Sequence, residues 1–98
     1  MSEQRSDRRT VRVRIEGGVQ GVGYRYWTER VADELGLTGW VRNRRDGSVE
    51  ALVDGDEAAV AELLRACRRG PRLANVTEIL EEMAEAPDEP GFLRLPTV

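Results

Sequence analysis

The first periodic pattern along the chain is an alternation of apolar and charged residues in the stretch TVRVRIE, residues 10–16. Every second side chain is apolar, and nearly all of the positions between them carry arginine or glutamate. Such alternation is typical of a strand with one buried face. The buried face would consist of Val11, Val13 and Ile15. Residues 1–9 are polar and charged, and we expect them to form a flexible tail before the strand.

A helical period follows a short glycine-rich junction. Apolar side chains recur every three or four positions, at Tyr24, Trp27, Val31 and Leu35, and charged residues fill the opposite side. This spacing predicts an amphipathic helix of about three turns. Gly36 directly follows the pattern and is suited to end the helix, because glycine adopts the left-handed conformation of a helix C-terminus.

The rest of the chain contains four further predicted strands and one further helix. Residues 37–43 and 48–53 are predicted strands, joined by a hairpin at Asp46-Gly47, which is a strong signal for a two-residue turn. Asp56 is predicted to cap a second helix, which Gly70-Pro71 ends. Its apolar face would consist of Val60, Leu63, Leu64 and Cys67. Residues 74–83 and 91–95 are predicted to form a fourth strand and a short last strand.

The order strand, helix, strand, strand, helix, strand is the split β-α-β motif of ferredoxin-like folds. We therefore expect an α+β sandwich, in which two helices cover one face of an antiparallel sheet and a short extra strand lies at the C-terminus. The chain has 98 residues, which fits one domain. We place that domain at residues 10–98.

The composition excludes several kinds of chemistry. The chain has no histidine, one cysteine and no lysine, so all 15 basic residues are arginine. This excludes histidine acid-base catalysis, the usual zinc sites, Schiff bases and the lysine of a P-loop. We expect no metal and no cofactor. The single cysteine, Cys67, lies on the predicted apolar helix face and is interpreted as a core residue.

Charge and hydropathy give expectations about partners and location. The formal net charge of -3 argues against nucleic acid as a partner. No apolar run approaches the ~20 residues of a membrane helix, and the N-terminus lacks the apolar core of a signal peptide. We therefore expect a cytoplasmic protein that does not associate with membranes. The arginine and glutamate clusters are interpreted as solvated faces.

The glycine-rich junction lies between the first predicted strand and the first helix. It comprises Gly17, Gly18, Val19, Gln20, Gly21, Val22, Gly23 and Tyr24. Glycines can turn successive backbone N–H groups inward to form an anion-binding nest, and a helix N-terminus adds further donors. Arg25 adds a planar guanidinium suited to phosphate oxygens. The alternative is a tight turn that needs glycine for steric reasons alone. The glycine spacing does not match either common nucleotide loop, so it indicates phosphate rather than nucleotide.

Asn43 is the second candidate for the site, because it shares strand parity with Val41 and would lie on the core side near the strand's end. The alternative is an asparagine that starts the following turn, which spacing alone favours. The candidate residues include no nucleophile and no general acid. A carboxylate leaving group, whose parent acid has a pKa of about 4, departs without protonation. The chemistry that fits is therefore hydrolysis of an acyl phosphate through positioning and charge stabilisation.

The stretches GGVQGVGYR and LGLTGWVRNRRDGSVEALVDG, followed by GPRLANV, resemble the acylphosphatase family from about Val11 to Leu95. The resemblance implies a ferredoxin-like enzyme that hydrolyses acyl phosphates without metal or cofactor. It implies that the loop from Gly17 to Gly23 cradles the phosphate, that Arg25 binds it, and that Asn43 holds the attacking water. Tyr24 stands where many relatives carry phenylalanine, which we expect to alter packing only. Gly18 stands where a larger residue such as arginine is common, so a peripheral substrate contact is expected to be missing.

The expected reaction is direct in-line attack by water, without a covalent intermediate. Inorganic phosphate would be a product and a competitive inhibitor, and the protein is expected to be a monomer.

One rival to this function is an RNA-recognition module, which shares the order of elements. Such a module stacks bases on aromatic residues of its central strands, and residues 10–16 and 48–53 contain no aromatic residue. The other rival is a non-catalytic anion-binding domain, like the acylphosphatase-like domains of hydrogenase maturation factors. The end of the chain at Val98 favours a free-standing enzyme.

Overall fold

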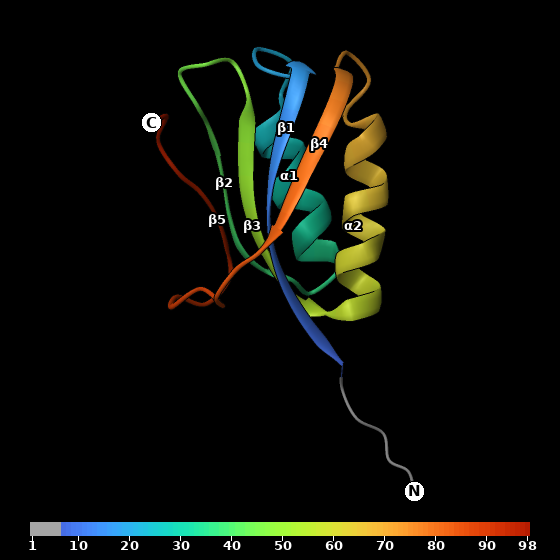
Figure 1. Cartoon of the computed structure of the whole chain (residues 1–98), viewed down its shortest axis with the longest axis vertical. Helices are drawn as coiled ribbons and strands as arrows, with labels where there is room; N and C mark the ends of the chain where they lie inside the picture. Colours follow the sequence, from blue (N-terminus) through green and yellow to red (C-terminus); the bar gives the residue numbers. More distant parts are fainter. Residues whose placement is uncertain (1–6) are drawn as a thin grey trace, which may run out of the picture.

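The computed structural model describes residues 7–98, in which one five-stranded sheet carries two helices on one face (Figure 1). The strands are β1 (Arg8–Gly18), β2 (Thr38–Asn43), β3 (Val49–Asp56), β4 (Asn75–Met83) and β5 (Phe92–Arg94). The helices are α1 (Tyr24–Glu34) and α2 (Glu57–Arg69). The strand order is β4-β1-β3-β2-β5. The predicted α+β, ferredoxin-like sandwich is confirmed.

The sheet is mixed, which corrects one detail of the prediction. Strands β1 to β4 pair with one another in antiparallel fashion. In contrast, β5 pairs with β2 in parallel, with Arg94 opposite Val41. The chain therefore crosses from β4 at one edge of the sheet to β5 at the other before it pairs. Residues 84–91 make this crossing.

The beginning of β1 also differs from the prediction. Residues 1–6 of the predicted tail lie outside the described residues. Arg8 and Arg9 were predicted to be tail, but they pair with Asp56 and Gly55 of β3. The extension is stabilised by Asp54, which accepts hydrogen bonds from the Arg8 guanidinium at 2.7 Å and from the Thr10 hydroxyl at 2.5 Å.

The core lies between the sheet and the two helices. The inward side chains of β1 and β3 pack against the predicted apolar face of α2, and Cys67 is 1% exposed, as expected of a core residue. In α1 the fully buried row is Tyr24, Thr28 and Ala32, whereas the predicted Trp27, Val31 and Leu35 are half-buried. Thr28 is tolerated in the core because its hydroxyl donates to the Tyr24 carbonyl at 2.8 Å. Neither helix in residues 7–98 is long and apolar enough to cross a membrane.

Candidate functional site

The predicted site residues converge on one hollow of about 190 Å³ at the end of the sheet where β1 leads into α1. Arg25 and Asn43 both line it, as do Gly21 and Gly23. The complete lining is Val19, Gly21, Gly23, Tyr24, Arg25, Tyr26, Asn43 and Arg94. The other predicted loop residues, Gly17, Gly18, Gln20 and Val22, do not line the hollow.

Gly17 and Gly18 are the last residues of β1 rather than part of the loop. The register between β1 and β4 shifts at Gly17, which pairs with Val76. Gly17 has φ 123°, and a β-carbon there would lie 2.1 Å from the Asn75 carbonyl oxygen. Only glycine fits at this register shift, which lies directly before the loop.

Gly21 and Gly23 give the loop its shape through their backbone conformation. Their φ angles are 76° and 79°, and nothing within 4 Å would obstruct a β-carbon at either position. The requirement for glycine is therefore conformational and not a matter of space. Left-handed residues of this kind turn neighbouring N–H groups towards one side, which is the geometry of an anion-binding nest.

The N-terminus of α1 adds hydrogen-bond donors to the hollow. Gly23 is the N-cap and offers no side-chain cap, and the first helical bond runs from Trp27 N–H to the Gly23 carbonyl at 3.0 Å. Within residues 7–98, the N–H groups of Tyr24, Arg25 and Tyr26 donate to no backbone carbonyl. The first turn contains no acidic residue. The positive end of the helix is therefore left for an anion.

Gln20 fixes the loop against the hairpin that follows β2. Its side-chain Nε2 donates to the Arg44 carbonyl at 2.7 Å and to the Ser48 carbonyl at 2.8 Å. These two carbonyls lie at the two ends of the hairpin loop. This role could not be predicted from the sequence, because a side-chain bond to a distant backbone carbonyl leaves no pattern along the chain.

The hairpin itself has a three-residue loop instead of the predicted two-residue turn. Arg44 N–H donates to the Ser48 carbonyl at 2.9 Å, which closes the loop around Asp46 and Gly47. The Asp46 carboxylate accepts from the Ser48 hydroxyl at 2.6 Å and from the Ser48 N–H at 2.9 Å. These two hydrogen bonds lower the pKa of Asp46. After two-residue turns, three-residue loops with a left-handed residue such as glycine are the most common hairpin connections.

Asn43 ends β2, where it pairs with Val49 and is half-buried. Its side chain lies on the same side as that of Val41, which is fully buried, as the strand parity predicted. Among the described residues, its carboxamide takes no part in the hydrogen bonds of the hairpin. The turn begins after it, so the alternative of a turn-forming asparagine does not describe this geometry.

Arg25 lies in the first turn of α1 and is half-buried. Its Nη1 donates to the Leu95 carbonyl at 3.4 Å, which is long for a hydrogen bond. The segment after β5 continues beside β2, since Leu95 N–H donates to the Val41 carbonyl and Val98 N–H to the Asn43 carbonyl. Among the residues that the structure describes, this weak contact leaves the guanidinium donors of Arg25 available to a stronger acceptor.

Arg94 and Tyr26 complete the hollow, and sequence reasoning missed both. Arg94 Nε lies 2.7 Å from a carboxylate oxygen of Glu29, and the Arg94 guanidinium carbon lies 5.6 Å from the centre of the Tyr26 ring. The two residues come together only because β5 pairs beside β2. No local pattern could have indicated this contact between segments so far apart in the chain.

Tyr24 connects α1 to α2 beneath the hollow. Its hydroxyl donates to the Cys67 carbonyl at 2.6 Å. This carbonyl is near the end of α2 and lacks a helical donor, because the residue four positions on is Pro71. The expectation that tyrosine alters packing alone is therefore incomplete, since its hydroxyl makes a buried hydrogen bond. Burial raises the pKa of the Cys67 thiol to about 12, so this cysteine is no candidate nucleophile.

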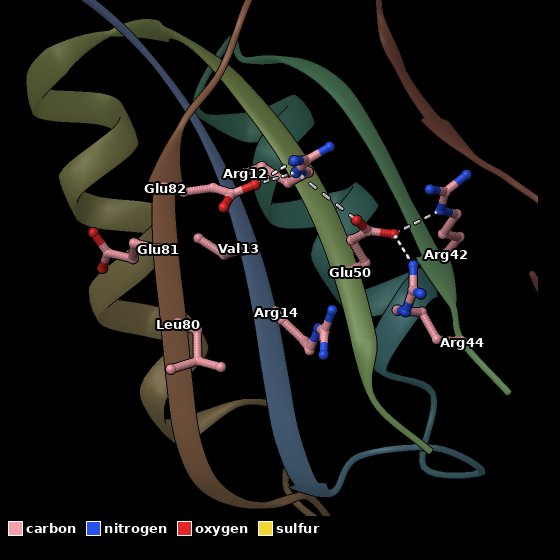
Figure 2. Close-up of a pocket in the computed structure, with 9 residues that line it drawn as sticks. All are labelled: Arg12, Val13, Arg14, Arg42, Arg44, Glu50, Leu80, Glu81 and Glu82. Atoms are coloured by element: carbon pink, nitrogen blue, oxygen red, sulfur yellow. Dashed lines mark hydrogen bonds and ion pairs between the residues drawn. The ribbon is translucent and has the colours of Figure 1, made fainter. Parts of the chain in front are cut away.

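A second, larger hollow of about 470 Å³ lies on the open face of the sheet (Figure 2). Buried Glu50 accepts hydrogen bonds from Arg42 Nε and Arg44 Nη1, both at 2.9 Å, and lies 3.9 Å from Arg12 Nε. Burial would raise the pKa of Glu50, but the hydrogen bonds from the arginines outweigh it and lower the pKa. The arginines of this hollow are paired with carboxylates, so it is a structural ion network that ties β1, β3 and β2 together.

The chain is similar to known proteins in sequence and in fold. A family model described as Acylphosphatase matches residues 11–93. A curated acylphosphatase of Acidiphilium cryptum is 61% identical over 83 residues, which cover 85% of this chain and 91% of that protein. The crystal structure of acylphosphatase from Bacillus subtilis matches with a TM-score of 0.83 at 36% identity, covering 88% of this chain and 97% of that one. The structure of an acylphosphatase from Coxiella burnetii matches with a TM-score of 0.87 at 30% identity, covering 97% and 100%.

Proposed function

Because the chain belongs to the acylphosphatase family and is an enzyme that hydrolyses acyl phosphates, we propose that its hollow of about 190 Å³ is the active site. The observation that carries this proposal is the convergence of three separate segments. The loop after β1, the first turn of α1 with Arg25, and the end of β2 with Asn43 all line this one hollow.

The phosphoryl group binds to the backbone N–H groups of the loop and of the first turn of α1, and Arg25 pairs with its oxygens. These donors are in place before the substrate binds, since the left-handed conformations of Gly21 and Gly23 fix their direction. Preorganised donors of this kind stabilise the charge on a transferring phosphoryl group without reorganisation. Arg25 gives up only a weak contact with the Leu95 carbonyl to do so.

Asn43 orients a water molecule in line with the bond between phosphorus and the acyl oxygen. The water oxygen forms a bond to phosphorus as the bond to the acyl oxygen breaks, and the leaving group departs with the electron pair as a carboxylate. No residue that lines the hollow carries a carboxylate, thiol or imidazole. The water proton therefore goes to a phosphate oxygen, and the products are a carboxylate and inorganic phosphate.

The first experiment is hydrolysis of benzoyl phosphate, followed by ultraviolet absorbance in the presence of EDTA, with inorganic phosphate as inhibitor. Arg25→Ala is expected to weaken phosphate inhibition and to lower kcat together, and Asn43→Ala to lower mainly kcat. The loss of one oriented group of this kind typically costs about 10²–10³ in rate. Arg30→Ala is the matched control, because Arg30 is an exposed arginine on the same helix whose ion-pair partner within residues 7–98 is Glu34 alone.

The outcomes separate the assignments. Metal-independent hydrolysis that is inhibited by phosphate and lost in both variants would support the roles of Arg25 and Asn43. Phosphate inhibition that survives unchanged in Arg25→Ala would refute the assignment of Arg25. A folded wild-type protein with no activity above the spontaneous rate would refute the proposed site and favour a non-catalytic anion-binding domain.

A further inference from the structure

A third hollow, distinct from the one on the open face of the sheet, adjoins the proposed active site in the groove between α1 and β5. It measures about 460 Å³, and its lining includes both Arg25 and Arg94, which also line the smaller hollow. The remaining lining residues are Glu29, Leu93, Leu95 and Pro96. The smaller hollow suits a phosphoryl group, and the larger one is the adjoining space into which an acyl group can extend.

The bond that breaks during hydrolysis would therefore lie where the two hollows meet. Two guanidinium groups stand at that junction, those of Arg25 and Arg94. Resting on the proposed function above, we propose that Arg94 is a further catalytic residue, which stabilises the carboxylate leaving group as its bond to phosphorus breaks. Arg25 holds the phosphoryl side of this bond, and Arg94 holds the acyl side.

The position of Arg94 follows from the parallel pairing of β5 with β2. Arg94 pairs with Val41, two residues before Asn43. Its guanidinium is oriented on two sides, by Glu29 at 2.7 Å from Nε and by the face of Tyr26. The contact with Glu29 engages Nε, and the guanidinium has two further amino groups with which to donate. An oriented guanidinium loses less freedom when it binds a ligand than a freely rotating one does.

The chemistry of the leaving group matches a guanidinium. The smaller hollow contains no carboxyl, thiol or imidazole group, and the Glu29 carboxylate of the larger hollow is paired with Arg94, so the acyl oxygen acquires its full negative charge as the bond breaks. In a loose phosphoryl-transfer transition state much of that charge has already developed. The resulting carboxylate is planar, with two equivalent oxygens, and the arginine fork binds this shape through two parallel hydrogen bonds. Arg94 thus interacts more strongly with the transition state than with the intact anhydride, which is the requirement for catalysis.

Three readouts test the proposal with Arg94→Ala. First, kcat for benzoyl phosphate is expected to fall about tenfold, less than the 10²–10³ typical of a buried donor because the Arg94 side chain is 51% exposed. Second, the inhibition constant of inorganic phosphate is expected to stay unchanged. Third, the loss of kcat is expected to grow with the pKa of the leaving acid, from 4-nitrobenzoyl phosphate through benzoyl phosphate to acetyl phosphate. Arg94→Lys, which keeps the charge without the fork, is expected to recover part of the rate.

Three outcomes with the Arg94 variants would overturn the proposal. Weaker phosphate inhibition in Arg94→Ala would place Arg94 on the phosphoryl group. A loss of kcat that is equal for all three substrates would show that Arg94 does not act on the leaving group. Kinetics like those of the control Arg30→Ala would remove Arg94 from catalysis. Failure of the wild-type protein to hydrolyse any of the three substrates would instead refute the proposed function. Thermal melting of each variant checks that it is folded.

Discussion

Replacement of Gln20 by alanine tests whether the loop and the hairpin act as one unit. The Gln20 side chain donates from Nε2 to two carbonyls of the hairpin, those of Arg44 and Ser48, at 2.7 and 2.8 Å. No other side chain among residues 7–98 is seen to join the loop to these two carbonyls. Gln20→Ala removes both bonds at once, and each carbonyl then keeps one backbone donor, Arg44 N–H for Ser48 and Gly47 N–H for Arg44.

The magnitude follows from the two bonds. A typical intramolecular hydrogen bond contributes about 0.5–1.5 kcal/mol net. Because both carbonyls keep a backbone donor, the loss is that of the two bonds alone, and we expect the free energy of unfolding to fall by about 1–3 kcal/mol. The effect on activity should be larger in relative terms, because a displacement of about 1 Å in a catalytic group can cost 10²-fold in rate.

The measurements are urea unfolding, kcat for benzoyl phosphate and the inhibition constant of inorganic phosphate. In the proposed site the phosphate donors lie within the loop that Gln20 braces, so phosphate inhibition should weaken, and kcat should fall as well because Asn43 precedes the hairpin. Gln20→Glu keeps the size of the side chain but places a carboxylate against two carbonyls, and it should destabilise the protein at least as much as alanine does. Unchanged stability together with unchanged kcat in Gln20→Ala would refute the reasoning.

Two further predictions concern stability. The buried carboxylates Glu50 and Asp54 both have lowered pKa values, since hydrogen bonds outweigh the effect of burial. Their contribution to stability is therefore complete above the unfolded-state pKa values of about 4 and is lost as the pH falls through the lower folded-state values. Urea unfolding from pH 7 to pH 2 should show this acid loss in the wild type, and Glu50→Gln and Asp54→Asn should each reduce its slope; an unaltered slope in both would contradict the pairing. Tyr24→Phe should lower the free energy of unfolding by about 1–3 kcal/mol, because the Cys67 carbonyl loses its donor, and a thermal melt that matches the wild type would show that this bond contributes nothing.

Most of the fold could be predicted because local periodicity and burial agree in this chain. The alternation at Val11, Val13 and Ile15 and the α2 face around Leu63 both correspond to residues that are at most 6% exposed. The exceptions arise where tertiary contacts decide. Thr28 is in the core because its hydroxyl bonds to its own helix, and the three residues of β5 are too few to reveal their direction of pairing.

The candidate site could be predicted only in part. The glycine loop and Arg25 have a local signal, since glycines directly before a helix indicate an anion site. The position of Asn43 followed from strand parity, but its assignment to the water came from family resemblance, and spacing alone favoured a turn. Arg94 and the bracing role of Gln20 had no signal, because each depends on contacts with residues far away along the chain.

The charge distribution explains why the geometry of this site has to be so closely fixed. The protein carries a net charge of -3, so at long range it repels an anionic substrate. At physiological ionic strength, charges beyond about 8 Å are largely screened, which limits that repulsion but equally prevents distant arginines from attracting the substrate. The arginines of the open face are in any case paired with Glu50 and its neighbours. Attraction must therefore come from donors within hydrogen-bonding distance, which in the proposed site are the loop N–H groups, the first turn of α1, Arg25 and Arg94. Short-range donors act only when they are correctly directed, and this is the physical reason for the left-handed glycines and for the bonds that brace the loop against the hairpin.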